Sequence, residues 1–288
     1  MTVLVDEPAA LRAACDAARA SGRRVGLVPT MGALHTGHVS LVDVARQRGA
    51  EHVALTIFVN PLQFAPTDDL DRYPRTLDAD LERCRAAGVD LVFAPKDGAM
   101  YAPGFSTHVT VADVTGPLEG VHRPGHFQGV TTVVAKLLNL AGPCVAVFGR
   151  KDYQQWRTLA RMVRDLDMPI EVVGAPIVRE ADGLALSSRN VYLSAEERAR
   201  ALGLVTGLRA AWDAFEAGER DPGRLLAIAS APVEAGFDRI DYVALADPDH
   251  LGPLDLPLPS RVLLAGAAHL GKTRLIDNVV LGEDPRPG

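Results

Sequence analysis

Cysteine and long apolar runs are scarce in this chain of 288 residues. Its three cysteines, Cys15, Cys84 and Cys144, are too few and too widely spaced for a disulfide framework or a zinc site, so we expect reduced thiols. No apolar run approaches the roughly 18 residues that span a bilayer. The N-terminus has early acidic residues and lacks the apolar segment of a signal peptide. We therefore expect a cytoplasmic protein without a membrane partner.

Basic charge is also in short supply. Acidic side chains number 36 and Lys plus Arg 30, which gives a formal net charge of −6. Proteins that bind nucleic acids are usually basic, so we expect no nucleic-acid partner, and a phosphate ligand would need a local basic site. Hydrophobic residues make up 48% and charged residues 23%, as in ordinary globular proteins. At roughly 150 residues per domain, the length indicates about two domains.

Residues 1–180 alternate between strand and helix patterns. Short β-branched apolar runs predict strands at 24–30, 52–60, 89–95, 107–114, 144–149 and 171–176. The segments between them predict a loop at 61–74 and helices at 39–48, 76–87 (with Thr76 as its N-cap), 130–140 and 152–166. This alternation implies right-handed crossovers, so we predict a Rossmann-like α/β domain with a doubly wound parallel sheet over residues 1–180. Ligands bind such sheets at the carboxyl ends of the strands.

A different pattern follows residue 180. A long helix is predicted at 194–217, beginning with a capping box of Ser194 and Glu197. A second helix at 223–235 and strands at 240–245, 261–265 and 274–281 follow it. We therefore predict a smaller C-terminal α+β domain over residues 181–288.

The segment TMGALHTGH, residues 30–38, follows the first predicted strand and precedes a predicted helix. Its core is H-x-G-H, formed by His35 and His38. Glycines let the backbone approach a ligand closely, and a helix N-terminus offers free N–H groups to a phosphate. Two imidazoles add donors for a phosphate that is losing its leaving group. The alternative interpretation is two surface histidines on a turn.

Two further segments could contact phosphates. Lys151, one of four lysines in the chain, follows the strand predicted at 144–149 and could bind a triphosphate as a point charge. Asp152 beside it is equally typical of a helix N-cap, and Gln155 could offer its amide to a small polar substrate. Ser187-Ser188-Arg189 suits a phosphate clamp, although such a stretch is also an ordinary polar turn.

Three remaining motifs are less specific. Asn60 and Gln63 are amides just past the second predicted strand and could also be turn residues. His126 lies in a loop before a helix and could be structural. Residues 266–273 match the P-loop pattern, with Lys272 as its lysine, but a P-loop needs a helix after its threonine. Here a strand pattern follows, so we predict a hairpin of 261–268 and 273–281 instead.

Together these segments resemble the pantothenate synthetase (pantoate–β-alanine ligase) family of the H-x-G-H nucleotidyltransferase superfamily. The matching stretches occur in order over nearly the whole chain: VPTMGALHTGH, IFVNPLQF, DLDRYPRTLDADL, GHFQGVTTVVAKLLN, FGRKDYQQ, VREADGLALSSRN and TRLIDN. One motif by itself would indicate only the superfamily, whereas the ordered set is much more specific.

The resemblance implies an ATP-binding ligase of pantothenate biosynthesis, in the coenzyme A pathway. (R)-Pantoate would attack the α-phosphorus of ATP to give pantoyl adenylate and pyrophosphate, and β-alanine would then attack the acyl carbon to give pantothenate and AMP. The resemblance also implies Mg²⁺ with the triphosphate and a homodimer. It identifies no direct metal ligand, and we expect Asp78 and Asp80 to be solvated acids on a helix surface.

The resemblance also assigns roles to residues. His38 is the expected catalytic histidine, assisted by His35, Lys151 and Arg189. The ATP-binding residues that it implies are Met31, Gly32, Ala33, Leu34, His35, Thr36, Gly37, His38, Gly149, Arg150, Lys151, Asp152, Val178, Leu186, Ser187, Ser188 and Arg189. The implied substrate-binding residues are Gln63, Gln155, Asn60, Thr30, Met31 and Tyr73, of which Gln63 and Gln155 would hold pantoate.

Two positions depart from the family pattern. Leu186 stands where the family usually has Met, a nearly volume-conserving exchange that should keep the adenine contact. Arg150 stands where the family usually has Glu, which could strengthen phosphate attraction or have no effect.

The alternative functions are another nucleotidyltransferase with a different small acceptor, a P-loop protein that uses Lys272, and a non-catalytic nucleotide-binding module.

Overall fold

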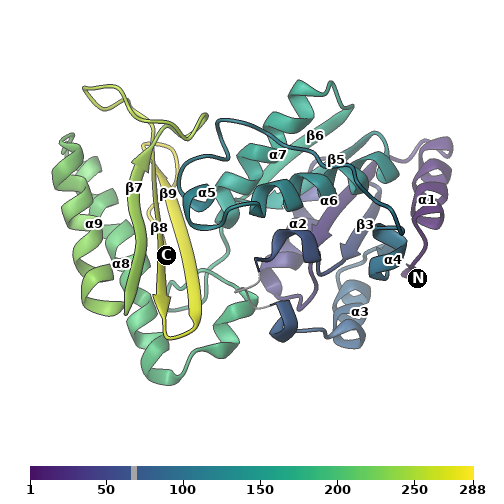
Figure 1. Cartoon of the computed structure of the whole chain (residues 1–288), viewed down its shortest axis with the longest axis horizontal. Helices are drawn as coiled ribbons and strands as arrows, with labels where there is room; N and C mark the ends of the chain where they lie inside the picture. The colour runs from purple at the N-terminus through teal and green to yellow at the C-terminus, as the bar shows by residue number, and fades with distance from the viewer. Residues whose placement is uncertain (66–69) are drawn as a thin grey trace. The chain divides into compact units, whose positions relative to one another are not determined.

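The computed structural model describes residues 1–65 and 70–288 (Figure 1). Its contacts divide the chain into two compact units, each described by itself below. Unit 1 consists of residues 1–112, 123–150 and 155–176, and unit 2 of residues 113–122, 151–154 and 177–288. The predicted domain boundary at residues 180 and 181 stays a prediction. Part of the loop predicted at 61–74 lies outside the described residues.

Unit 1 contains a six-stranded parallel sheet, which confirms the predicted α/β fold class. Its strands are β1 (Val3–Val5), β2 (Val25–Thr30), β3 (His52–Ile57), β4 (Leu91–Phe93), β5 (Cys144–Gly149) and β6 (Ile170–Ala175). They lie in the order β1-β4-β3-β2-β5-β6. The apolar runs of β2, β3, β4 and β5 are buried because helices cover both faces of a parallel sheet, whereas Val3 and Leu4 of the edge strand β1 are exposed.

Helices pack on the two faces of this sheet around two apolar cores. The main helices are α1 (Pro8–Ala20), α2 (Thr36–Gln47), α3 (Leu77–Ala86), α6 (His126–Ala141) and α7 (Tyr153–Asp165), with short turns α4 (Asp97–Met100), η1 (Pro61–Gln63), η2 (Leu70–Arg72) and η3 (Arg150–Asp152). Side chains of α1, α6 and α7 share one core, and those of α2 and α3 share the other. The sheet therefore separates two layers of helices, as in a doubly wound fold.

Residues 107–114 do not form the predicted strand. The N–H of Val109 donates to Thr132 Oγ1 (3.0 Å), and its carbonyl accepts from Thr131 Oγ1 (2.6 Å). Hydroxyl groups of α6 thus satisfy this backbone, while Val109 and Val111 pack against the core. Alternation of apolar residues indicates that one side of a segment is buried. It does not show whether the backbone is hydrogen-bonded to a neighbouring strand or to other groups.

Several element boundaries also differ from the sequence prediction. Helix α2 begins at Thr36, three residues before the predicted start, because His35 caps it. Thr76 is the N-cap position of α3, but its side chain makes no capping hydrogen bond. Elements β1 and α1 have no counterpart in the prediction: β1 has only three residues, and alanines make up much of the apolar content of α1.

Unit 2 contains a three-stranded antiparallel sheet and two long helices. Its elements are α5 (Glu119–His122), η4 (Ser188–Tyr192), α8 (Ala195–Glu216), α9 (Pro222–Gly236), β7 (Arg239–Ala246), β8 (Val262–Leu270) and β9 (Thr273–Leu281), with sheet order β7-β8-β9. The predicted capping box starts α8: Ser194 Oγ accepts from the Glu197 N–H (3.1 Å), and Glu197 accepts from the Ser194 N–H (2.8 Å). Apolar side chains of α8, α9 and the sheet form its core.

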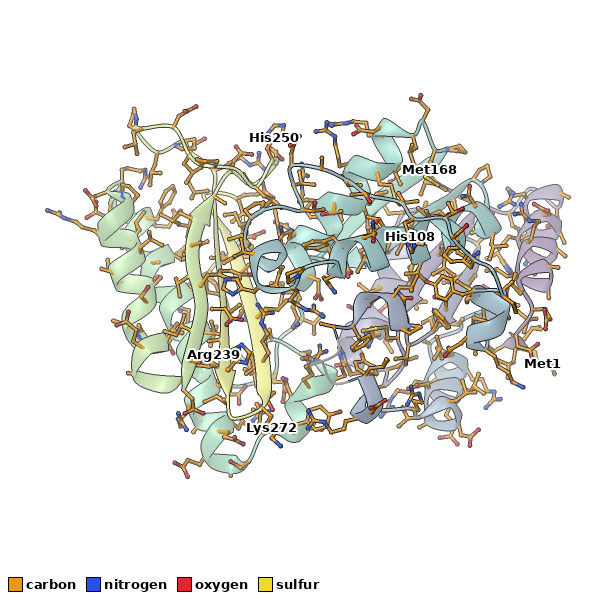
Figure 2. All side chains as sticks on the ribbon, in the orientation of Figure 1. Met1, His108, Met168, Arg239, His250 and Lys272 are labelled. Atoms are coloured by element: carbon orange, nitrogen blue, oxygen red, sulfur yellow. The ribbon has the colours of Figure 1, made fainter. Side chains whose placement is uncertain are left out.

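The P-loop interpretation of residues 266–273 is wrong. Leu270 pairs with Thr273 across a tight turn, so β8 and β9 form the predicted hairpin. Figure 2 shows Lys272 at the tip of this hairpin. Because a strand and not a helix follows Thr273, no helix N-terminus is present to bind a phosphate.

Candidate functional site

The turn after β2 lies where the winding of the sheet reverses. From β2 the chain winds through β3 and β4 on one side and then crosses to β5 on the other side of β2. Strands β2 and β5 are parallel, with Gly26 opposite Val145, so their carboxyl ends meet at one edge. Open α/β sheets bind ligands at such a switch point. The residues that follow β2 and β5 are therefore the first candidates for a binding site in unit 1.

His35 and His38 together cap the N-terminus of α2. The Nδ1 of His35 accepts a hydrogen bond from the Gly37 N–H (3.1 Å), and the Nδ1 of His38 accepts one from the His35 N–H (3.3 Å). The two ring centroids are 4.1 Å apart. Because both Nδ1 atoms accept, the proton of each neutral ring is assigned to Nε2, which can donate. The structure thus brings the predicted pair together at a helix end that attracts anions.

A buried carboxylate of α3 holds this turn, and sequence reasoning missed it. Asp80 is 0% exposed, so the expectation of a solvated acid is wrong. Its two oxygens accept hydrogen bonds from the N–H groups of Ala33 (2.9 Å) and Leu34 (2.8 Å). Gly32 has φ 82°, which favours glycine, and a Cβ there would lie 3.1 Å from the carboxylate. Asp80 shares the buried face of α3 with Cys84, and this spacing of four residues is the signal that could have revealed it.

Three predicted substrate-binding residues contact one another. Asn60 Nδ2 donates to Gln63 Oε1 (3.0 Å), and Gln63 Nε2 donates to Met31 Sδ (3.3 Å). Asn60 is 1% exposed, and its Oδ1 accepts from the Tyr101 hydroxyl (2.7 Å). Asn60 therefore orients the amide of Gln63, while Gln63 borders the turn that carries Met31.

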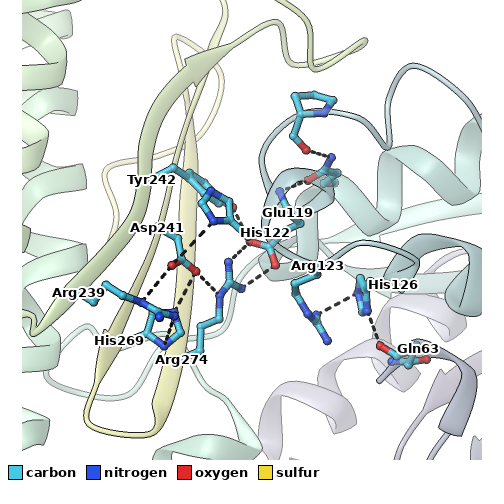
Figure 3. A network of polar contacts seen from close by, with 12 residues as sticks. Gln63, Glu119, His122, Arg123, His126, Arg239, Asp241, Tyr242, His269 and Arg274 are labelled. Atoms are coloured by element: carbon cyan, nitrogen blue, oxygen red, sulfur yellow. Dashed lines mark hydrogen bonds and ion pairs between the residues drawn. The ribbon is translucent and has the colours of Figure 1, made fainter. Parts of the chain in front are cut away.

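The backbone of Gln63 is fixed by a close approach between η1 and α6. A Cβ on Gly129 would lie 2.2 Å from the carbonyl oxygen of Leu62, so only glycine fits there. His126 Nε2 accepts from Arg123 (3.1 Å), which leaves Nδ1 to donate to the Gln63 carbonyl (2.9 Å; Figure 3). His126 thus has the structural role that the sequence left open.

Other predicted residues of unit 1 make contacts within the fold. Thr30 Oγ1 donates to the Thr56 carbonyl (2.7 Å) and accepts from the Gly32 N–H (3.2 Å), which fixes the end of β2. Tyr73 is 6% exposed and packs edge-on against Phe64, with ring centroids 5.9 Å apart. Both side chains therefore have structural partners, and their contact with substrate stays a prediction.

Arg150, the departure from the family pattern, lies over an aromatic ring of α7. Its guanidinium carbon is 5.6 Å from the ring centroid of Trp156, and that of Arg157 is 5.1 Å from the same centroid. A cation over an indole is stabilised by the charge distribution of the ring. The Arg150 side chain is therefore held against Trp156 of α7. Gly149 and Gln155, on either side in the sequence, are half-buried.

In unit 2, residues 151–154 carry the predicted Lys151 and Asp152. Lys151 is half-buried and Asp152 exposed. Gln154 anchors the segment: its Nε2 donates to two backbone carbonyls (2.7 and 2.9 Å), and its Oε1 accepts from the Glu119 N–H (3.0 Å). Sequence reasoning missed Gln154 because nothing in the sequence distinguishes two adjacent glutamines. In the structure, Gln154 is buried and Gln155 is half-buried.

The remaining predicted ATP-binding residues lie in a short hairpin and the turn that follows it. The Leu186 N–H donates to the Val178 carbonyl (3.0 Å), which brings these two residues together. Ser187 is the N-cap of η4, and its Oγ accepts from the Arg189 N–H (3.2 Å). Val178, Leu186, Ser187, Ser188 and Arg189 therefore belong to one folded segment of unit 2.

Charged side chains fasten this segment to α8. Arg198 donates to Glu180 (2.7 Å) and to Asp182 (2.7 Å), and Asn190 Nδ2 donates to Glu180 (2.8 Å). The Arg198 hydrogen bond holds the pKa of Glu180 below its ordinary value despite partial burial. The charged form of Glu180 is therefore the one that stabilises the hairpin.

A larger charged network connects α5 to the sheet of unit 2 (Figure 3). Arg274 donates to both carboxylate oxygens of Glu119 (2.7 and 2.8 Å) and to Asp241 (2.7 Å). The Tyr242 hydroxyl donates to Glu119 (2.7 Å), and His269 Nε2 lies 3.0 Å from Asp241. Burial raises the pKa of Asp241, but hydrogen bonds from Arg274 and His269 outweigh it, so this pKa lies below its ordinary value.

Outside residues 66–69, no three His, Cys, Asp or Glu side chains gather as metal ligands. In the same part of the chain, no helix combines the length and the apolar character needed to cross a membrane. Cys15, Cys84 and Cys144 are free, and burial raises their pKa values to about 11, 11 and 12. These thiols are therefore protonated at neutral pH and weakly nucleophilic.

Sequence comparisons agree on one family. The family model described as pantoate-beta-alanine ligase matches residues 3–280. The pantothenate synthetase of Anaeromyxobacter dehalogenans is 56% identical over 281 residues, which cover 96% of this chain and 97% of the relative. That of Moorella thermoacetica is 52% identical over 279 residues, covering 96% and 98%.

Solved structures have the same fold. The pantothenate synthetase from Thermus thermophilus has a TM-score of 0.91 at 46% identity and covers 97% of this chain and 99% of its own. The pantoate-beta-alanine ligase from Francisella tularensis, crystallised with beta-gamma ATP and beta-alanine, has a TM-score of 0.80 at 29% identity and covers 99% of both chains. The similarity therefore extends over nearly the whole chain.

Proposed function

Because this chain belongs to the pantoate–β-alanine ligase family, we propose that it condenses (R)-pantoate with β-alanine at the expense of ATP. The observation that carries the proposal is the family match over residues 3–280, together with the H-x-G-H histidines at the switch point of the sheet. Another nucleotidyltransferase with a different acceptor is not favoured, since relatives with 56% and 52% identity are pantothenate synthetases.

The proposed reaction has two steps. A carboxylate oxygen of pantoate forms a bond to the α-phosphorus of ATP, the bond from that phosphorus to the bridging oxygen breaks, and pyrophosphate leaves. The amine of β-alanine then attacks the acyl carbon, the acyl–phosphate bond breaks, and AMP leaves with that oxygen. The amine loses a proton as the amide forms. Such a reaction needs orientation and charge stabilisation more than covalent catalysis by the protein.

Residues of unit 1 would stabilise and orient the first step. The Nε2–H groups of His38 and His35 can donate to phosphate oxygens as negative charge moves toward pyrophosphate, and the N-terminus of α2 favours the same charge. Gln63 and Gln155 would hold pantoate, and Gln63 would also help to position β-alanine. The contact between Gln63 and Met31 supports this role, because it places the Gln63 amide beside the histidine-bearing turn.

Residues of unit 2 would bind the nucleotide. Lys151 and Arg189 would neutralise the phosphates, Ser187 and Ser188 would donate hydrogen bonds to them, and Val178 with Leu186 would contact the adenine. The hydrogen bond between Leu186 and Val178 supports a shared role for the last two. Arginine and lysine suit phosphate through charge-assisted hydrogen bonds.

Mg²⁺ would enter as its complex with ATP. Mg²⁺ in nucleotide sites is usually held by substrate phosphates, waters and one or two carboxylates, so it does not require a cluster of protein ligands. We also propose a cytoplasmic homodimer, on the basis of the family resemblance. Sedimentation equilibrium would measure twice the mass of one chain for the dimer and a single-chain mass if this proposal is wrong.

The proposed function is tested by following AMP and pyrophosphate release from ATP and Mg²⁺ with each substrate omitted in turn. We expect ATP–pyrophosphate exchange that requires pantoate alone and AMP release that requires pantoate and β-alanine. Replacing pantoate with a hydroxy acid of similar size is the control for acceptor identity. Absence of any pantoate-dependent turnover in a correctly folded protein would contradict the proposal.

A further inference from the structure

Two consecutive residues of β9, Asp277 and Asn278, are buried polar groups in the TRLIDN segment. Asp277 is 3% exposed and Asn278 is 5% exposed. A buried polar side chain is costly unless it is hydrogen-bonded. Neighbouring residues of a strand point to opposite faces, so these two side chains can hold different parts of unit 2.

Asp277 binds the base of the hairpin that carries the predicted phosphate-binding residues. Arg179 Nη1 and Nη2 donate to its two oxygens at 2.6 and 2.9 Å, and Nη1 also donates to the Gly183 carbonyl (3.1 Å). The ion pair is buried, with 11% of the Arg179 side chain and 3% of the Asp277 side chain exposed. Such a two-point pair fixes orientation as well as distance.

The position of Arg179 determines the position of the residues that follow. Arg179 pairs with Ala185 across the hairpin, and its neighbours Val178 and Glu180 bond to Leu186 and Asn190. The segment from 186 to 190 is thereby tied, through Arg179, to β9. Arg189, the predicted cation of this segment, lies within it.

Asn278 holds the other predicted cationic segment. Its Nδ2 donates to the backbone carbonyl of Lys151 at 2.9 Å. The residues after Lys151 are fixed independently: the Tyr153 hydroxyl donates to the Pro248 carbonyl (3.0 Å), and Gln154 is bonded to the segment 113–122. The contact from Asn278 is therefore made at the residue that itself carries the cation.

We propose that Asp277 and Asn278 are a pair of positioning residues that set the spacing between Lys151 and Arg189 for the triphosphate of ATP. One strand holds both cationic segments of unit 2 through adjacent side chains, Asp277 through Arg179 and Asn278 directly. Neither residue is a catalytic residue, since each acts through another group. The proposal rests on the proposed function, because that function makes Lys151 and Arg189 phosphate ligands.

Asp277→Asn and Asn278→Ala test the pair through pantoate-dependent ATP–pyrophosphate exchange. We expect each variant to lose kcat/KM for ATP on the order of 10- to 100-fold, as small misplacements of binding groups do, with the KM for pantoate unchanged. Arg179→Lys provides a second test should Asp277→Asn fail to fold, because it keeps the charge but removes the two-point geometry. Asp213→Asn is the matched control: it breaks an exposed two-point pair with Arg286 (2.7 and 2.7 Å) in the same unit, and its ATP kinetics should equal wild type.

Double-mutant cycles separate positioning from general stability. In an Arg189→Ala background, Asp277→Asn should have almost no further effect on ATP kinetics, and Asn278→Ala should have none in a Lys151→Ala background. Asp277→Asn should keep its full effect in a Lys151→Ala background, and Asn278→Ala should keep its full effect in an Arg189→Ala background. Equal losses in every background would show a merely structural role and overturn the proposal.

Folded Asp277→Asn or Arg179→Lys protein with wild-type ATP kinetics would also overturn it. Failure of the proposed function is distinguishable, since wild-type protein would then show no pantoate-dependent exchange at all. In that event, calorimetric titration with MgATP still decides the matter. A higher Kd for ATP in Asp277→Asn than in Asp213→Asn supports the positioning role, and equal Kd values contradict it.

Discussion

At the scale of single residues, His35 and His38 combine two roles. Each accepts a backbone hydrogen bond through Nδ1 to cap α2, so the proton of each neutral ring is assigned to Nε2. The cap fixes the rings relative to the helix N-terminus, so the donors are oriented before any ligand binds. Orientation of this kind is what makes a donor effective in a transition state.

His38→Ala should slow pantoate-dependent ATP–pyrophosphate exchange by about 100-fold or more, because one oriented donor to the phosphate is lost. It should also lower the free energy of unfolding by about 1 kcal/mol, since half of the cap is lost. Asp221→Ala is the matched control, as it removes the cap of α9 that bonds the Arg224 N–H (2.8 Å). The Asp221→Ala control should lose a similar amount of unfolding free energy and keep the wild-type exchange rate. An exchange rate near wild type in His38→Ala would refute the assignment.

Gln63→Ala should impair pantoate use more than ATP binding, because the Gln63 amide is oriented by Asn60 beside the turn that carries Met31. We expect the KM for pantoate to rise by about tenfold, the effect of losing a substrate hydrogen bond of roughly 1.4 kcal/mol. The readout is steady-state kinetics with each substrate varied. Gln128→Ala, which removes an exposed amide of α6 bonded to Thr110 (3.0 Å), is the control. Unchanged pantoate kinetics in Gln63→Ala would contradict the prediction.

At the scale of elements, the turn between β2 and α2 depends on α3. Asp80 of α3 accepts hydrogen bonds from the N–H groups of Ala33 and Leu34 in this turn. Gly32 and Ala33 have positive φ values there. A backbone in this conformation persists only where neighbouring groups hold it. The shape of the histidine-bearing turn is therefore set by a carboxylate that follows Ala33 by 47 residues and Leu34 by 46 residues in sequence.

Asp80→Asn should destabilise the protein by about 1–3 kcal/mol, because an amide cannot accept both hydrogen bonds and one buried N–H loses its partner. It should also weaken ATP binding, since the turn is released. Denaturant unfolding measures the first effect, and titration with MgATP measures the second. Asp78→Asn is the control, because Asp78 lies exposed in the same first turn of α3. Equal stability of the two variants would show that the buried carboxylate does not hold the turn.

At the scale of the whole molecule, each unit has apolar cores, and unit 2 adds a buried network of charged side chains. Arg274 bonds both Glu119 and Asp241 with little exposure of the three side chains. Loss of one member of such a buried set leaves an unpaired charge, so Arg274→Ala should cost about 3–5 kcal/mol. This dependence on charge makes the stability of the molecule sensitive to acid.

Asp241 provides the test of this acid sensitivity. Its folded-state pKa lies below the ordinary value of roughly 4. Its contribution to stability is therefore complete above the unfolded-state pKa and is lost as the pH falls through the folded-state pKa. Unfolding free energies measured between about pH 2 and pH 5 should show a steeper acid loss in wild type than in Asp241→Asn. Asp255→Asn, on an exposed loop, should keep the wild-type slope. A common slope in all three proteins would exclude this role for Asp241.

The sequence by itself determined the fold class and which segments carry the chemistry. Alternating apolar runs and caps are local signals, so β2, β3, β5, β6 and α8 lie close to their predicted positions. The H-x-G-H turn and the hairpin of β8 and β9 were likewise predicted, because turn residues and strand patterns are read within a few neighbouring residues.

Only the tertiary structure decided how those segments are held. The hydrogen bonds of buried Asp80, the contact between Gln63 and Met31, and the contacts of Asp277 and Asn278 join residues far apart in sequence. Residues 107–114 fail as a strand for the same reason, since hydroxyls of α6 bond their backbone. Pattern and spacing report which side of a segment is apolar. The partner of a buried polar group depends on packing, which no local stretch of sequence specifies.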